Sequence, residues 1–253
     1  MTAEGTPKRR RAGRPKQNVL SPRLIHETAL RLIDRHGVDG AGMRAIAAEL
    51  GVRPSSLYNH VAGQHELIAG VRDLVSERIP TEPFADRPWD EALELWARGY
   101  RLAFASHPPT IALLAVQPLT GDSATSFMYD TVAAALVRAG WPEERALSVI
   151  VAFECFILGA ALDLAADPTM LDPGRRDDVP AFSGAYRARG AALDASGASP
   201  ADDAFEIGLR AMLAGLRAEY ALLGTESPVA SPREARAEAP GEAPGEALGG
   251  ARR

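Results

Sequence analysis

Residues 44–61 restrict the fold most, because their pattern is typical of two short helices joined by a tight turn. Ile46 and Leu50 lie one helical turn apart and give the first helix a single buried face. Gly51 follows the last apolar position, where helices commonly end in a left-handed residue. Pro54 suits the first turn of the next helix, whose N–H groups have no intrahelical partner. The segment therefore predicts a helix-turn-helix.

The outer face of the second helix is polar, whereas Leu57 and Val61 face inward at i, i+4. Hydroxyl, amide and imidazole groups on a short helix can hydrogen-bond to phosphates and base edges of DNA. These outward-facing side chains are Ser55, Ser56, Tyr58, Asn59 and His60.

This segment resembles the helix-turn-helix signature of the TetR family of bacterial transcriptional regulators. The resemblance spans residues 21 to about 75 and rests on Gly51-Val52, Ser56-Leu57-Tyr58-Asn59-His60-Val61 and Glu66-Leu67. The alternative is that Tyr58 and His60 only pack a helical bundle. The expected DNA contacts are Arg44, Arg53, Ser55, Ser56, Tyr58, Asn59, His60, Gln64 and, in the N-terminal arm, Arg14.

Two positions depart from the family pattern: Gly42 stands where Ser or Thr is usual, and Gln64 where Lys is usual. Positive charge for gripping phosphates then has to come from Lys8 to Lys16. The Gly-Arg-Pro at Arg14 partly resembles an AT-hook, an arm that places Arg in a narrow minor groove. The alternative is a disordered tail that adds only nonspecific affinity.

The distribution of charge favours nucleic acid as partner of the N-terminal part. Residues 1–80 contain 13 basic and 8 acidic side chains, a formal charge of +5. The remaining 173 residues contain 15 basic and 25 acidic side chains, a charge of −10. A basic head on an acidic chain orients toward a polyanion.

The fold class expected is all-α, because no run alternates apolar and polar residues between turn clusters. Helices are expected at 22–36, 65–79, 89–106, 109–116, 123–139, 143–165 and 202–223, with only a short helix near 182–189 inside a loop at 167–200. The expected domains are a disordered basic arm at 1–20, a DNA-binding domain at 21–79, a ligand-binding and dimerisation domain at 88–223, and a disordered tail at 224–253.

Several features point to the cytoplasm. The basic N-terminus lacks the apolar segment of a secretory signal, and no uninterrupted apolar run approaches the ~20 residues of a membrane helix. The single cysteine, Cys155, excludes an intramolecular disulfide. No membrane partner is expected.

Two long helices of the second domain carry apolar stripes wider than one neighbour covers, which predicts a homodimer built as an intermolecular four-helix bundle. The alternative is that both stripes pack within one chain. The stripes are Val149, Ile150, Phe153, Phe156, Ile157 and Ala160, and Phe205, Leu209, Met212, Leu213, Leu216 and Tyr220.

These two helices also resemble, more loosely, the tetracycline-repressor branch of the family, which binds a drug–magnesium complex through a His and a carboxylate. Asp163 falls where the carboxylate would lie, but residues 109–115 contain no His. We therefore expect neither tetracycline, nor a bound metal, nor a cofactor.

A small-molecule cavity is still expected in the second domain, where Trp96, Tyr100 and Phe104 form an aromatic stripe at i, i+4, i+8. The alternative is that this stripe is ordinary core. Cys155 is a further polar point on its apolar helix. The candidate ligand-binding residues are Trp96, Tyr100, Phe104, Phe127, Met128, Phe153 and Asp163.

The leading hypothesis is a homodimeric repressor that an unknown small-molecule effector releases from a double-stranded, palindromic DNA operator. The alternative is a constitutive DNA-binding or architectural protein without an effector. An enzyme is rejected, because the five histidines show no metal spacing with acids, and neither a Gly-rich phosphate loop nor a nucleophile arrangement can be placed.

Overall fold

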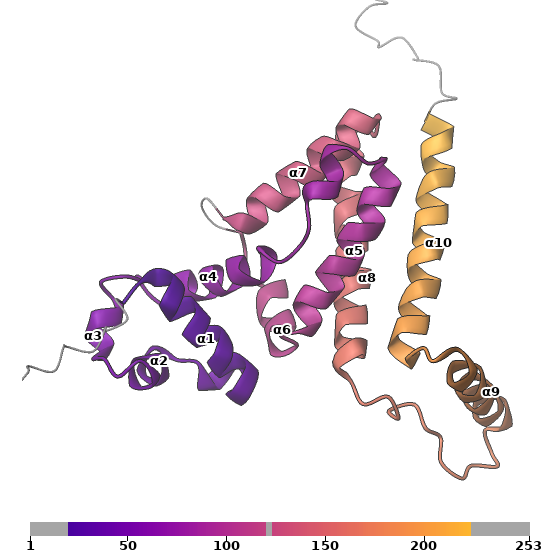
Figure 1. The fold of residues 1–253 in the computed structure, drawn as a ribbon, viewed down its shortest axis with the longest axis horizontal. Helices are drawn as coiled ribbons and strands as arrows, with labels where there is room; N and C mark the ends of the chain where they lie inside the picture. The colour runs from indigo at the N-terminus through magenta and orange to yellow at the C-terminus, as the bar shows by residue number, and fades with distance from the viewer. Residues whose placement is uncertain (1–19, 120–122, 224–253) are drawn as a thin grey trace, which may run out of the picture. The chain divides into compact units, whose positions relative to one another are not determined.

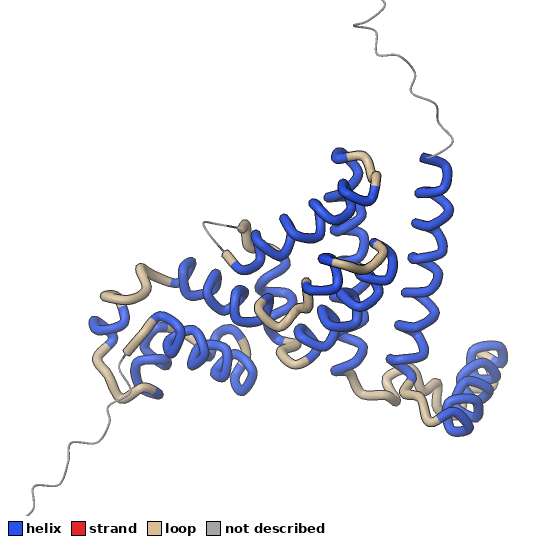
Figure 2. The backbone as a smooth tube through the Cα atoms, turned by 45° about the horizontal axis from the view of Figure 1, so that its top comes forward, coloured by secondary structure: helices blue, strands red, loops and turns tan. Residues whose placement is uncertain are grey.

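The computed structural model describes residues 20–119 and 123–223, which are helical and contain no strand within those ranges (Figures 1 and 2). In chain order the elements are α1 (Pro22–His36), η1 (Val38–Gly40), α2 (Met43–Glu49), α3 (Pro54–Leu57), α4 (Gln64–Ser76), η2 (Glu82–Ala85), α5 (Trp89–Ala105), α6 (Pro109–Ala115), α7 (Ala124–Ala139), α8 (Glu143–Ala165), α9 (Pro180–Ser196) and α10 (Pro200–Leu223). The expected all-α class is confirmed.

Helix α1 has the start and stop that its sequence predicts. The Ser21 hydroxyl accepts a hydrogen bond from the Leu24 N–H at 3.3 Å, and Pro22 occupies the first helical position. The helix ends at Gly37, whose φ of 73° is costly for residues with a Cβ. Its fully buried Ile25 and Ala29 pack within the core that α1 shares with α4.

Helices α2 and α3 form the predicted helix-turn-helix. Gly42 is the N-cap of α2 and offers no side-chain hydrogen bond. Gly51, with a φ of 67°, makes the turn that precedes α3. Helix α3 is shorter than expected, since it ends at Leu57 and its chain continues as a turn to the buried Val61.

Helices α5, α7 and α8 pack together and enclose the core of the second part of the chain (Figure 1). Trp96 and Phe153 are fully buried between them. Helix α4 packs on α1 and also contacts α5 and α7. It therefore belongs both to the N-terminal group of helices, α1 to α4, and to the second group, α5 to α8. Movements in one group can therefore be passed to the other through α4.

The expectation of a loop over 167–200 with only a short helix was wrong in extent, because α9 spans 17 residues. Pro180 opens it and Gly197, with a φ of 71°, ends it. Its one buried residue is Leu193, so it has no apolar stripe for periodicity to detect. Its six alanines favour the helix instead.

The chain falls into two compact units, residues 1–213 and 214–253. The predicted basic arm with Arg14 and the predicted tail at 224–253 lie outside the described residues. Among those described, α8 is the one helix that is long and apolar enough to cross a membrane by length and composition, although it is interrupted by Glu154.

Candidate nucleic-acid interface and ligand cavity

The side chains of the helix-turn-helix fall into two sets, those buried in the core and those exposed to solvent. Leu57 and Val61 are buried, whereas Tyr58 keeps 54% of its surface exposed. Arg53 precedes α3 as its exposed N-cap. The remaining predicted contacts are also accessible: Arg44, Ser55, Asn59 and Gln64 are exposed, and Ser56 and His60 are half-buried.

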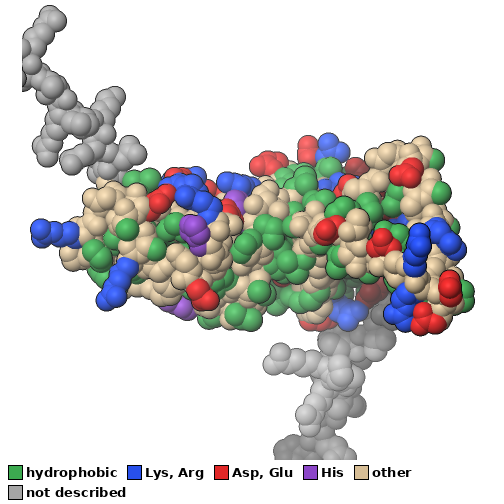
Figure 3. Space-filling model, turned by 90° about the horizontal axis from the view of Figure 1, so that it is seen from below, with side chains coloured by type: hydrophobic (Ala, Val, Ile, Leu, Met, Phe, Trp, Pro, Cys, Tyr) green, Lys and Arg blue, Asp and Glu red, His purple; other side chains and the backbone are tan. Residues whose placement is uncertain are grey.

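At the left of Figure 3, where helices α1 to α4 lie, histidine and basic side chains are exposed beside acidic ones. The turn that follows α3 is held by Glu66, whose carboxylate accepts a hydrogen bond from the Ala62 N–H at 2.6 Å. The accessible polar groups of α3 thus lie on a short, braced segment that can enter a DNA groove.

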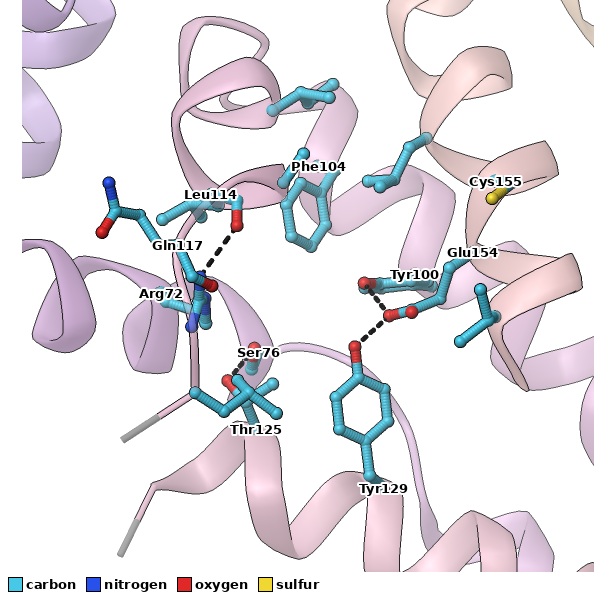
Figure 4. Close-up of a pocket in the computed structure, with 15 residues that line it drawn as sticks. Arg72, Ser76, Tyr100, Phe104, Leu114, Gln117, Thr125, Tyr129, Glu154 and Cys155 are labelled. Carbon is cyan, nitrogen blue, oxygen red and sulfur yellow. Dashed lines mark hydrogen bonds between the residues drawn. The ribbon is translucent and has the colours of Figure 1, made fainter. Parts of the chain in front are cut away.

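A cavity of about 310 Å³ lies among α4, α5, α6, α7 and α8 (Figure 4). Its volume is at the lower end of the range for small-molecule sites. Most of its wall is apolar, with polar groups at a few points. Its lining residues are Arg72, Ser76, Tyr100, Phe104, Ile111, Leu114, Ala115, Gln117, Leu119, Thr125, Tyr129, Val151, Glu154, Cys155 and Leu158.

Of the ligand-binding residues predicted from sequence, Tyr100 and Phe104 line this cavity. Trp96 is fully buried behind it and stacks on Tyr100, with ring centroids 5.2 Å apart. Phe153 and Met128 are core residues, and Phe127 is 66% exposed. Asp163 lies in a different hollow, beside the segment that follows α8.

The polar centre of the cavity was not among the residues predicted from the sequence. The Tyr100 hydroxyl donates to the Glu154 carboxylate at 2.7 Å, and the Tyr129 hydroxyl donates to the same oxygen. Burial raises the pKa of both phenols, and the charge and hydrogen bond of Glu154 raise it further. The signal available was Glu154 itself, a carboxylate in the middle of the apolar run at residues 149–162.

Arg72 connects the cavity to α4. Its guanidinium donates to the backbone carbonyls of Leu114 at 2.8 Å, Gln117 at 2.5 Å and Pro118 at 3.1 Å. A cation at the end of a helix also suits the negative end of its dipole. The buried Arg72 therefore ties α4 to the last turn of α6, which forms part of the cavity wall.

His107 makes a second connection between the two groups of helices. Its Nδ1 lies 2.8 Å from the Asp34 carboxylate of α1, and its Nε2 lies 2.8 Å from the Arg78 guanidinium. Since a guanidinium can only donate, Nε2 accepts and Nδ1–H donates to Asp34. The imidazole thus joins the end of α1 to the segments that follow α4 and α5.

Two family models match the chain, one over its N-terminal helices and one over the helices that form the cavity. The bacterial regulatory proteins of the tetR family match residues 25–70, and the tetracyclin repressor-like C-terminal domain matches residues 82–220. Among the described residues no group of three or more His, Cys, Asp or Glu is placed to hold a metal ion.

Individual relatives agree with these matches. The HTH-type transcriptional repressor DrrR1 of Streptomyces coeruleorubidus is 32% identical over 60% of this chain, which spans 56% of the relative's length. The tetracycline repressor protein class A from transposon 1721 of Escherichia coli is 28% identical over 78% of this chain and 90% of its own. The structure of a possible TetR family transcriptional regulator from Streptomyces coelicolor A3(2) has a TM-score of 0.60 and 25% identity, covering 78% of this chain and 99% of that one.

Proposed function

We propose that this chain, which belongs to the tetR family of bacterial regulatory proteins, represses transcription by binding a palindromic operator as a homodimer and is released from it by a small molecule. The observation that carries the proposal is Arg72, which joins α4 to the wall of the cavity, since α4 packs on α1 and α1 packs in turn on α2 of the helix-turn-helix. Function of this kind places the protein in the cytoplasm with the DNA.

The α3 segment is the proposed reading element. Tyr58 and Asn59 are exposed at the end of α3, and Ser55 is exposed at its start, so phosphates and base edges are both within the chemistry these groups offer. Arg44 and Arg53 add charge for the DNA backbone. Because Gly42 and Gln64 contribute none, we propose that the basic arm supplies further phosphate contacts.

The homodimer is proposed from an apolar face that the described chain leaves uncovered. Part of the predicted stripe of α8 packs within its own chain, because four of its residues are buried there: Val149, Ile150, Phe153 and Ile157. The opposite side of α8 exposes Leu147 and Leu162, which keep 62% and 49% of their surface. Ile207 of α10 is 55% exposed. Such a face is typical of a helical interface, and symmetry supplies the second half-site contact.

Release follows from the way the cavity is built. A ligand in the cavity touches Ile111 and Leu114 of α6, and any shift of α6 moves the carbonyls that hold Arg72. Because α4 packs on α1, such a shift changes how the two reading elements of a dimer are spaced. Ligand and operator then favour different arrangements and weaken each other's binding.

Operator selection from a genomic library followed by anisotropy titration tests the DNA-binding half. Tyr58→Ala and His60→Ala are each expected to weaken specific binding by ~1–3 kcal/mol with the fold intact. His36→Ala, which removes an exposed imidazole outside the predicted contacts, is the control. Unchanged binding by the Tyr58→Ala, His60→Ala double variant would show that α3 is not the reading element.

Two further measurements address the arm and the effector. Removing residues 1–16 should reduce the slope of binding against salt concentration, since fewer phosphate counterions are released. Screening small molecules for loss of operator binding separates this function from a constitutive or architectural protein. If no molecule that occupies the cavity weakens operator binding, the constitutive alternative replaces the repressor released by an effector.

A further inference from the structure

Glu154 is the acidic group in the cavity wall, and only one of its two carboxylate oxygens accepts hydrogen bonds from the described residues. Both phenols, Tyr100 from α5 and Tyr129 from α7, donate to Oε1 (Figure 4). In the described part of the chain no donor reaches Oε2. An ionised carboxylate has about four acceptor positions, so the two phenols leave Glu154 with capacity for a ligand.

Arg72, the other charged side chain among the described lining residues, does not neutralise Glu154. Figure 4 places the two on opposite sides of the cavity. The Arg72 guanidinium points at the carbonyls of Leu114, Gln117 and Pro118, which are its hydrogen-bond acceptors. Within the described residues no ion pair joins Arg72 to Glu154. The negative charge therefore faces a mostly apolar space without a contacting counter-charge.

The rest of the wall near Glu154 suits a cation as well. The rings of Tyr100 and Phe104 meet edge to face with centroids 5.0 Å apart, and Tyr129 completes an aromatic border. Aromatic faces attract ammonium groups within a few ångströms. Apolar side chains, among them Ile111 and Leu158, form most of the remaining surface, to which Ser76, Gln117 and Thr125 add polar groups.

The two phenols also hold the carboxylate in position before a ligand arrives. Burial and Glu154 raise the pKa of both tyrosines, so both keep their protons and donate. A carboxylate fixed by donors on two other helices loses little freedom when it binds a cation.

From this geometry we propose that the effector is an organic cation, an ammonium group on an apolar or aromatic body, whose charge binds at Glu154 Oε2 while its body fills the aromatic and aliphatic part of the cavity. The inference rests on the proposed function, because it names the class of molecule that occupies the effector cavity. An uncharged body alone would leave the carboxylate desolvated and unpaired, which costs binding free energy.

A purely structural role for Glu154 makes a different prediction. If the carboxylate only ties α5, α7 and α8 together, a cavity ligand gains nothing from a positive charge. The Glu154→Gln variant separates the roles, because its carbonyl oxygen still accepts from Tyr100 and Tyr129 while the second oxygen becomes an N–H₂ donor. Glu144→Gln, at an exposed position of the first turn of α8, is the matched control.

Three probes that share a ring system and differ in charge test the proposal: naphthylmethylammonium, naphthylmethanol and naphthoate. Calorimetric titration of the full chain is expected to show the ammonium binding roughly 10-fold to 100-fold tighter than the alcohol, as for a charge-assisted hydrogen bond. Glu154→Gln should abolish that preference, and Glu144→Gln should keep it.

The remaining outcomes overturn the proposal. Equal binding of the three probes, tightest binding of naphthoate, no binding of any probe, or a preference that survives Glu154→Gln each excludes an ammonium ligand at Glu154. The wild-type comparison decides alone if the variant does not fold. Operator binding by the same preparations judges the proposed function separately: intact DNA binding without an ammonium preference refutes this inference only.

Discussion

Replacing Arg72 with methionine tests whether this side chain holds α4 against α6. Methionine keeps an unbranched stem of similar length and removes the guanidinium. The three carbonyl oxygens of Leu114, Gln117 and Pro118 then lose their donor. The change is therefore confined to one polar connection in the core.

The three bonds do not contribute equally to stability. A hydrogen bond from a charged donor contributes roughly 1.5–3 kcal/mol. Gln117 is half-buried and Pro118 exposed, so water can replace the donor at these two carbonyls, whereas the bond to the carbonyl of the buried Leu114 is lost outright. We expect the free energy of unfolding to fall by about 2–4 kcal/mol, which lowers the melting temperature by about 4–16 °C for a chain of this size.

Thermal and urea unfolding followed by circular dichroism measure this loss. Arg72→Lys, which keeps one donor nitrogen, should fall between the wild type and Arg72→Met. Arg87→Met removes an exposed arginine whose ion pair to Glu91 is 3.8 Å long. It should change the free energy of unfolding by only about a few tenths of a kcal/mol. A melting temperature of Arg72→Met equal to that of the wild type would refute the connection and, with it, the proposed route from cavity to operator.

Three further changes probe the packing and capping of helices α1 and α4. Gly70→Ala places a Cβ 2.1 Å from the His26 ring and should cost about 1–3 kcal/mol of stability in urea unfolding, because the ring has to move; wild-type stability would show that the α1–α4 contact is loose. Burial lowers the pKa of His26 below its ordinary 6.5, so the unfolded chain binds the proton more readily than the folded chain. The free energy of unfolding therefore falls as the pH drops through and below about 6.5. His26→Gln should flatten that dependence between about pH 7.5 and 5, and an unchanged slope would contradict the buried position of His26. Ser21→Ala removes the cap of α1 and should cost ~1 kcal/mol, measured by urea midpoint against Ser55→Ala, an exposed serine that does not cap a helix.

Two helices were located to the residue from start signals and apolar stripes: Ser21 caps the first of them, and Pro142 precedes the second. Residues 22–36 and 143–165 were predicted with the bounds that α1 and α8 have. Helix α3 is shorter than its pattern indicates, because the inward pair Leu57 and Val61 is satisfied by a turn as well as by a helix. Helix α9 lacks a stripe, so periodicity did not detect it.

The ligand cavity was harder to predict because it depends on contacts between helices. Trp96, Tyr100 and Phe104 are spaced by four residues, and each such step rotates the side chain by about 40° around the helix. Trp96 therefore points into the core while Phe104 reaches the cavity. Tyr129 and Glu154 lie on different helices, so their meeting follows from packing that no local pattern specifies.

The division of labour around α3 also bears on how such regulators diversify. Leu57 and Val61 position the segment from the inside, while Tyr58 and Asn59 face outward and support no part of the core. Substitutions at exposed positions usually change stability by less than about 0.5 kcal/mol. After gene duplication, one copy could therefore acquire a new operator through its outer face while its folding, its pairing and its response to a ligand remained those of the parent.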